Sequence, residues 1–177
     1  MALGKDYEGQ DCALARALEL VGERWTLLVI RDAFYGVCRY SDFVAHLGIP
    51  RAVLSDRLQA LTSAGVLERR RYSESPPRDE YVLTQMGKEL WPALHALGHW
   101  GSRHMSPDGP SKFYVHAGCG TRLNAAGLCP ECDGGPVPPE DVEVRPVREG
   151  RAGTRADPVS RALTRPHRML RPLTEHA

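Results

Sequence analysis

The apolar residues of this chain recur every three or four positions over most of residues 10–105, which is the spacing of one face of an α-helix. Leu14, Leu18 and Val21 follow this spacing, and a glycine comes directly after them, as is common at a helix end. The pattern predicts helices at about residues 14–21, 24–34, 42–47 and 50–64. The last two are short and are joined through Gly48, which indicates a helix-turn-helix.

The pattern changes to two strand-like runs after the fourth helix. Residues 66–72 and 79–83 are typical of strands, and the polar, Pro-rich segment between them is typical of a turn, so we predict a β-hairpin. A last helix is predicted to begin at Thr84. Its apolar residues, which continue to Trp100, cover a face too broad for one core, and we expect the excess to pack against a second copy of the chain.

Composition and charge narrow the class of protein. Apolar residues make up 42% of the 177 positions and charged residues 25%, as in globular proteins. The longest apolar stretch, residues 25–30, is too short to cross a bilayer, and acids occupy the N-terminus where a secretory signal needs an apolar run. We therefore expect a soluble, cytoplasmic protein with no membrane partner. Residues 1–144 carry 15 Lys and Arg against 19 acids, whereas residues 145–177 carry eight Arg against three acids. DNA binding by the first part would thus require a local basic face.

A helix-turn-helix followed by a basic hairpin is the architecture of winged-helix DNA-binding domains, in which the second helix enters the major groove. Leu54, Leu58 and Leu61 form the core-facing stripe of that helix, so its other side faces outward. We predict that the DNA contacts come from the outward side, its flanks and the hairpin: Arg51, Ser55, Arg57, Gln59, Arg69, Arg71 and Arg78. Because side chains alternate along a strand, Arg70 cannot point the same way as its two neighbours. The alternative for each residue taken alone is a solvated surface position.

Several blocks of sequence, occurring in order over about residues 10–103, resemble the HxlR-type regulators, a branch of the MarR-like winged-helix transcription factors. The blocks include Gly22-Glu23-Arg24-Trp25-Thr26, Arg39-Tyr40-Ser41-Asp42-Phe43 and Pro76-Pro77-Arg78-Asp79-Glu80-Tyr81. The resemblance implies a homodimer on a roughly palindromic operator in double-stranded DNA, with dimerisation through the N-terminal segment and the last helix. Ala13 departs from the family pattern, and the resemblance explains nothing after about Met105.

Cys12 falls at the position where HxlR-type redox sensors carry their reactive thiol. A cysteine in the first turn of a helix is stabilised as a thiolate by the helix dipole, and Arg16 lies one turn away. The alternative is a small apolar helix residue. Cys12 is therefore a candidate redox sensor, and the effector is an oxidant or a small molecule.

The strongest chemical motif is His116-x2-Cys119 followed nine residues later by Cys129-x2-Cys132. One imidazole and three thiolates complete a tetrahedral zinc shell, and so short a segment has too little apolar surface to fold unaided. We predict a structural zinc bound by His116, Cys119, Cys129 and Cys132. The alternative is free or oxidised thiols beside an incidental histidine. A catalytic deaminase-like site is not expected, because Gly118 stands where its glutamate would be.

These observations predict a mainly α-helical protein with a small β-hairpin wing, namely a dimeric winged helix-turn-helix with a small zinc-ribbon-like appendage. The expected domains are residues 10–105 for DNA binding and dimerisation, 113–135 for the zinc knuckle, and 136–177 for a flexible Pro/Arg-rich tail. The predicted function is a homodimeric, effector- or redox-responsive transcriptional regulator. The alternative is an adaptor that binds partner proteins through the knuckle and tail. An enzyme is not expected, since the sequence offers no nucleophile–base pair or phosphate loop.

Overall fold

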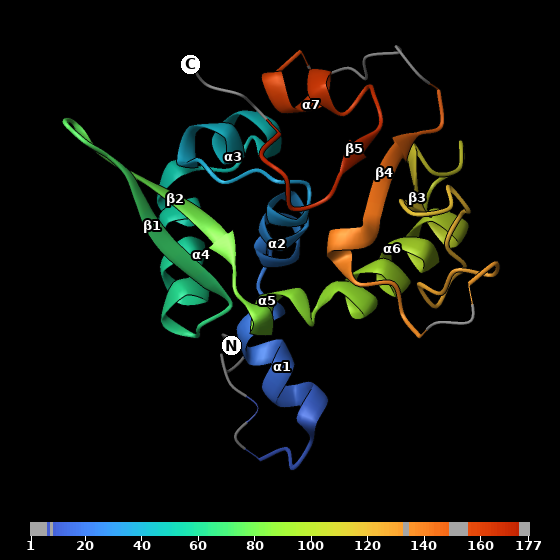
Figure 1. Cartoon of the computed structure of the whole chain (residues 1–177). Coiled ribbons are helices and arrows are strands. Elements are labelled where there is room, and N and C mark those ends of the chain that lie inside the picture. Colours follow the sequence, from blue (N-terminus) through green and yellow to red (C-terminus); the bar gives the residue numbers. More distant parts are fainter. Residues whose placement is uncertain (1–6, 8, 133–134, 149–155, 174–177) are drawn as a thin grey trace.

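The computed structural model describes residues 7, 9–132, 135–148 and 156–173 (Figure 1). Of the predicted knuckle and tail, residues 133–134, 149–155 and 174–177 lie outside the described residues. The elements of the first part are α1 (Ala13–Val21), α2 (Thr26–Phe34), α3 (Tyr40–Leu47), α4 (Arg51–Ser63), β1 (Leu67–Glu74), β2 (Pro77–Leu83), α5 (Gln85–Lys88) and α6 (Trp91–His104). The elements of the second part are β3 (Lys112–His116), a 3-10 turn η1 (Pro139–Asp141), β4 (Val142–Pro146), α7 (Pro158–Ala162) and β5 (His167–Arg168).

The helix-turn-helix is formed by α3 and α4, as predicted. Helix α3 ends at Gly48, whose φ of 65° is the left-handed conformation that ends helices. Pro50 occupies the N-cap position of α4, and Leu54, Leu58 and Leu61 are all buried along the inner side of the helix. The predicted core stripe is therefore confirmed, and it fixes which side of α4 faces outward.

Strands β1 and β2 form the predicted wing, an antiparallel hairpin whose register runs from Leu67 opposite Leu83 to Glu74 opposite Pro77. The hairpin extends away from the rest of the molecule beside α4 (Figure 1). The predicted last helix is interrupted: Thr84 caps only the single turn of α5 by accepting the Gly87 N–H, and α6 begins separately at Trp91. A proline at the second position of α6 suits a helix start, because that N–H needs no intrahelical partner.

The prediction of a flexible tail over residues 136–177 is wrong where the structure describes that segment. Strand β4 pairs antiparallel with β3 on one side and with β5 on the other, so the order is β3-β4-β5. Val142 and Val144 of β4 and Met169 after β5 are among the most deeply buried residues of the chain. The Pro- and Arg-rich composition predicted a flexible segment, but its few apolar residues pack against distant parts of the chain and order it.

The end of the described chain returns to the helix-turn-helix and clasps the end of α2. The Leu170 N–H donates to the Phe34 carbonyl at 2.9 Å, and the Leu173 N–H donates to the Gly36 carbonyl at 3.3 Å. Gly36 has a φ of 88°, and a Cβ there would lie 1.7 Å from the Arg171 carbonyl oxygen. Helix α7 lies against α3 (Figure 1). We call residues 156–173 the C-terminal clasp.

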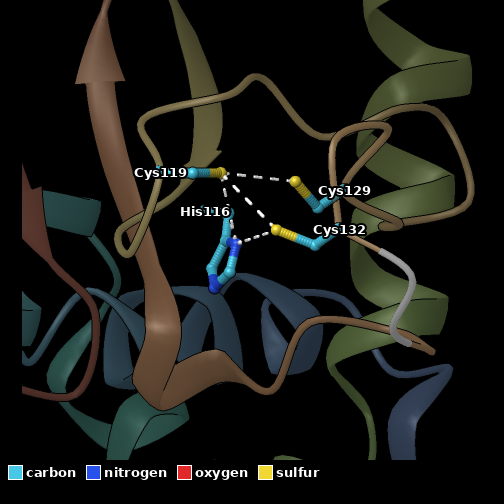
Figure 2. A group of neighbouring side chains, drawn as sticks. All are labelled: His116, Cys119, Cys129 and Cys132. Atoms are coloured by element: carbon cyan, nitrogen blue, oxygen red, sulfur yellow. Dashed lines mark hydrogen bonds between the residues drawn. The ribbon is translucent and has the colours of Figure 1, made fainter.

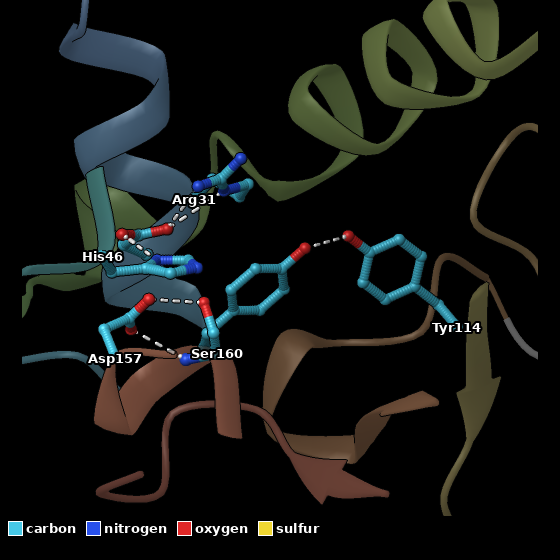
Figure 3. Close-up of polar contacts among 7 residues, drawn as sticks. Arg31, His46, Tyr114, Asp157 and Ser160 are labelled. Atoms are coloured by element: carbon cyan, nitrogen blue, oxygen red, sulfur yellow. Dashed lines mark hydrogen bonds and ion pairs between the residues drawn. The ribbon is translucent and has the colours of Figure 1, made fainter. Parts of the chain in front are cut away.

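Two groups of polar contacts lie beside the second part of the molecule, and one of them, between Tyr35 and Tyr114, joins the two parts (Figure 3). The Asp32 carboxylate is fully buried and accepts hydrogen bonds from Arg31, at 2.7 and 3.0 Å, and from Nδ1 of His46 at 2.6 Å. Tyr35 directly follows α2, and its hydroxyl lies 3.0 Å from the hydroxyl of Tyr114 in β3. Figure 3 shows these contacts beside Asp157, which caps α7 by accepting the Ser160 N–H. A buried carboxylate with several donors is a feature that fixes one arrangement of the surrounding elements.

Candidate functional site

The outward side of α4 is open to solvent in the single chain. Ser55 and Gln59, the two residues predicted to reach base edges, are both exposed, and so is Arg51 at the start of the helix. The Ser55 hydroxyl donates to the Arg51 carbonyl at 3.1 Å and lies 3.2 Å from the hydroxyl of Tyr40. Tyr40 also donates to the Arg51 carbonyl at 2.8 Å, so it links the first turn of α3 to the first turn of α4. The sequence reasoning missed this role of Tyr40.

Arg57 is placed differently from the other predicted DNA contacts. Its guanidinium lies 3.5 Å from the Glu23 carboxylate, in the segment between α1 and α2, and its Nε is buried without a hydrogen-bond partner. The side chain thus points back along the protein rather than outward. The sequence could not reveal this, because Glu23 and Arg57 are far apart along the chain.

The wing arginines divide between its two faces, as strand alternation predicts. Arg69 and Arg71 both bind the Asp79 carboxylate of the facing strand, whereas Arg70 pairs with Glu68 on the other face. These hydrogen bonds lower the pKa of Asp79. Arg71 also lies 3.6 Å from the Glu74 carboxylate, so two acids within the wing oppose the charges of Arg69 and Arg71. The Arg78 side chain is exposed near the tip and makes no hydrogen bond or ion pair with a described residue.

The four predicted metal ligands come together (Figure 2). Nδ1 of His116 lies 3.4 Å from the sulfurs of both Cys119 and Cys132, and the Cys119 sulfur lies 3.5 Å from Cys129 and 3.8 Å from Cys132. All four ligand atoms lie within 4.8 Å of one another. Bond lengths of about 2.3 Å to sulfur and about 2.0 Å to nitrogen place tetrahedral zinc ligands about 3.5–3.8 Å apart. The spacing in the structure therefore suits a small tetrahedral cation.

Local backbone geometry brings these ligands together. His116 ends β3, and its carbonyl accepts the N–H groups of Cys119, at 3.3 Å, and Gly120, at 2.7 Å, in a tight turn. Gly120 has a φ of 76°, which the turn requires. The Cys132 N–H donates to the Cys129 carbonyl at 3.3 Å in a second, similar turn. Each pair of ligands thus lies on one turn, as the two x2 spacings predict.

The thiols of the cluster do not ionise alike. Hydrogen bonds from Thr121 lower the pKa of Cys119 to about 6, whereas hydrogen bonds with Cys129 and Cys119 raise the pKa of Cys132 to about 11. Three sulfurs this close repel one another as thiolates, and a divalent cation among them removes that penalty. The cluster can hold a metal ion, and its donor set is the one that zinc prefers.

The cluster is attached to the winged helix through an aromatic group. Trp91 and His95 of α6 lie with ring centroids 5.2 Å apart, and each contacts Tyr114 of β3 edge-on. His95 donates its Nε2 hydrogen to the Asn124 carbonyl at 2.9 Å, in the loop between the two ligand pairs. Burial lowers the pKa of His95, and this outweighs the hydrogen bond to Asn124, which raises it. The predicted knuckle is thus packed on α6 rather than separate from it.

The comparisons with known proteins decide the family. A model of the HxlR-like helix-turn-helix matches residues 20–109. A helix-turn-helix transcriptional regulator of Mycobacterium tuberculosis, itself uncharacterised, is 43% identical over 131 residues, which cover 73% of this chain and 82% of that protein. The chain belongs to the HxlR-like helix-turn-helix family. It is a transcriptional regulator of the HxlR/MarR type, and its winged helix is the family's DNA-binding architecture.

Two solved structures resemble this HxlR-like protein. The protein PA1607, described as a candidate transcription factor, has a TM-score of 0.54 and 30% identity, over 85% of this chain and 91% of that one. The reduced form of the redox regulator HypR has a TM-score of 0.51 and 25% identity, over 53% of this chain and 94% of that one. The match to PA1607 exceeds the length of residues 20–109, so it includes part of the sequence outside the family model.

The family assignment also bears on the other expectations. The relatives are transcriptional regulators, a class that generally lacks enzymatic activity, and none of the comparisons favours the adaptor alternative. Within the described residues, no helix is long and apolar enough to span a membrane. Cys12 is exposed and occupies the N-cap position of α1 without a side-chain capping hydrogen bond. Arg16, one turn away, pairs with Glu19 at 2.6 Å.

Proposed function

We propose that this HxlR-like regulator binds double-stranded DNA as a homodimer, with α4 in the major groove and the wing against the phosphate backbone. The observation that carries the proposal is the exposed outward side of α4 beside a hairpin rich in arginine. Ser55 and Gln59 would contact base edges, and Arg51 a base or a phosphate. A two-fold dimer would place its α4 helices about 34 Å apart, on a palindromic operator.

The contacts within the wing separate its arginines by role. Arg78 would bind a phosphate directly, since no acid of the described chain holds it. Arg69 and Arg71 would bind phosphate while sharing Asp79, so the pair brings less than two full charges to DNA. Arg57 would act mainly by holding α4 to Glu23. This assignment keeps six of the seven predicted residues as DNA contacts and gives Arg57 a supporting role.

The apolar surface supports a dimer. Leu14 and Leu18 of α1, and Leu97 and Trp100 of α6, are exposed by 37–66%. Two large apolar faces on the first and last helices of the winged helix are unusual for a monomer. We propose that a second copy covers them, as the sequence predicts.

We propose that the cluster of His116, Cys119, Cys129 and Cys132 holds a structural zinc ion. Four protein ligands leave no open position for a catalytic water, so the ion would order the two turns that carry them. Its effect would be to fix the end of β3 and, through it, the sheet.

We propose Cys12 as the thiol through which an oxidant would act, with a small molecule as the other class of effector. HypR, a redox regulator, shares this fold. Burial, with further help from Glu80, raises the pKa of Cys38 to about 11, so that thiol reacts slowly. Among the two cysteines outside the metal cluster, the exposed Cys12 is therefore the better candidate.

The test of DNA binding begins with an operator selected from a random double-stranded pool. Fluorescence anisotropy over a salt series then compares Arg78→Ala with Arg70→Ala, a matched change in the same hairpin at an arginine whose charge Glu68 already balances. We expect Arg78→Ala to reduce the slope of log K against log salt by about 1, and Arg70→Ala to leave it unchanged. Gln59→Ala should cost about 1–3 kcal/mol on the selected sequence and little on random DNA. The absence of any preferred sequence would contradict the proposal, and so would equal effects of the two arginine variants.

A further inference from the structure

A cleft of about 360 Å³ lies between α6 and β3, within the size range of small-molecule sites. His95, Gly98 and Ser102 of α6 line one wall, and Lys112, Phe113 and Tyr114 of β3 line the other. The apolar residues Leu97 and Trp100 lie on the opposite side of α6, because 95, 98 and 102 fall on one helical face. Packing of a second copy on that apolar side would therefore leave the cleft open.

The charged side chains that line the cleft are all cationic. They are Arg103 of α6, Lys112 of β3 and Arg122 of the loop that follows, and no Asp or Glu is among the described lining residues. Arg122 is held over the ring of Phe113, with its guanidinium carbon 5.2 Å from the centroid, and strand alternation puts that ring on the other face of β3 from Lys112 and Tyr114. Three cations from three segments of the chain thus lie around the cleft, and Lys112 shares with Tyr114 the face of β3 that contacts α6.

Lys112 is the most buried of the three. Its side chain makes no hydrogen bond or ion pair with any residue that the structure describes. Burial is the largest effect that lowers its pKa, and the Arg31 guanidinium lowers it further, whereas the Asp32 carboxylate opposes both. Because Asp32 already accepts hydrogen bonds from Arg31 and His46, the Lys112 ammonium has no direct anionic contact, and a ligand anion can supply one.

We propose that this cleft is a binding site for a small organic anion, with a carboxylate or a phosphate held by Lys112 and Arg103 and a flat apolar part against Tyr114, which lies on the same face of β3 as Lys112. A larger cavity of about 730 Å³ shares Pro110 and Lys112 with the cleft, but Asp108 also lines it and its carboxylate would oppose an anion. Binding in the cleft is independent of the proposed regulator function. Only the further statement that the anion is the effector rests on that function.

The experiment is isothermal titration calorimetry on the full-length, metal-loaded protein with benzoate and with phenyl phosphate. Benzamide, which has the same ring and no charge, is the control ligand. We expect at least one anion to bind saturably at concentrations up to about 10 mM, and benzamide to show no binding in that range. The two anions distinguish a carboxylate site from a phosphate site.

Variants locate the site. Lys112→Met should weaken binding at least about tenfold, because it removes a charged contact and keeps most of the stem. Arg103→Met, at an exposed position, should also weaken it and tests the proposal if the Lys112 variant fails to fold. Arg148→Met removes a cation that lines only the larger cavity and should leave the affinity within about twofold. The absence of binding by both anions, equal binding of benzamide, or equal weakening by Arg148→Met would overturn the proposal.

The DNA-binding assay repeated with the bound anion tests the effector role separately. A changed operator affinity would support that role. An unchanged affinity, with calorimetric binding intact, would reject the role and retain the site.

Discussion

Replacement of Gly36 by alanine tests whether the C-terminal clasp is docked on the helix-turn-helix. A Cβ at this position would lie 1.7 Å from the carbonyl oxygen of Arg171, far inside any real contact. That oxygen belongs to the backbone, and the neighbouring N–H groups of Leu170 and Leu173 are bonded to the end of α2. The added methyl group can therefore be accommodated only if residues 170–173 move away.

Gly65 provides a matched control. Its φ of 76° is close to the 88° of Gly36, but a Cβ there would have no atom within 4 Å. Alanine at either position carries left-handed strain of about 1–2 kcal/mol. Only Gly36→Ala also loses two backbone hydrogen bonds, about 1 kcal/mol each. It further loses part of the burial of Met169, whose full exposure would cost about 1.5–3 kcal/mol. We expect Gly36→Ala to lower the free energy of unfolding by about 2–4 kcal/mol more than Gly65→Ala.

Urea denaturation of both variants measures this difference, and hydrogen exchange of peptides within 156–173 shows whether the clasp has moved. Faster exchange there in Gly36→Ala alone is the expected result. If the two variants lost equal stability within about 0.5 kcal/mol, with unchanged exchange in the clasp, the close approach of Arg171 to Gly36 would be refuted.

Three further predictions concern the metal, the cysteines and the cap of α7. Chelation of zinc should lower the thermal midpoint by at least about 5 °C, a loss of about 2 kcal/mol, and added zinc should restore it; an unchanged midpoint in metal-free protein would contradict a structural ion. At pH 8, iodoacetamide should modify Cys12 well before Cys38, since the pKa of Cys38 is raised to about 11; mass spectrometry of timed samples checks the order, and faster labelling of Cys38 would contradict it. Burial opposes ionisation of Asp157, but hydrogen bonds from Ser160 outweigh burial and lower the pKa of Asp157. The stabilisation from these hydrogen bonds is therefore fully present above the ordinary pKa of about 3.9, and it is lost as the pH falls through the lowered pKa. Asp157→Ala should therefore cost about 1 kcal/mol at pH 7 in urea denaturation, and the cost should shrink toward pH 3, where a constant difference would exclude the carboxylate as its source.

The winged helix and the ligand cluster could be predicted from sequence because their signals are local. The stripe of Leu54, Leu58 and Leu61 lies within one helix, and each ligand pair lies within one turn. Strand alternation also predicted that Arg69 and Arg70 of the wing lie on opposite faces of the hairpin. In each case the residues that determine the structure are neighbours along the chain, so spacing alone carries the information.

The C-terminal segment could not be predicted in the same way, because its order comes from distant partners. Strand β4 has five residues, of which Val142 and Val144 alternate with charged ones. That alternation is typical of a strand, but it covers too few residues to predict one among so many Pro and Arg residues. The strand is stable because β3 and β5 pair with both its edges. The pairing of Glu23 with Arg57, and of Tyr35 with Tyr114, is non-local for the same reason.

The same long-range contacts make the metal cluster part of the helix-turn-helix rather than an independent appendage. His116 pairs with Val142 at the end of β3, and Val144 of β4 pairs with His167. Three residues later, Leu170 is bonded to the end of α2, and α7 lies on α3. Two strand pairings and one backbone hydrogen bond therefore separate a metal ligand from the helices that position α4. Because sheet pairing is cooperative, disorder at His116 would weaken the clasp before it reached α4. Metal-free protein should accordingly show fast hydrogen exchange in residues 156–173 while α4 stays protected.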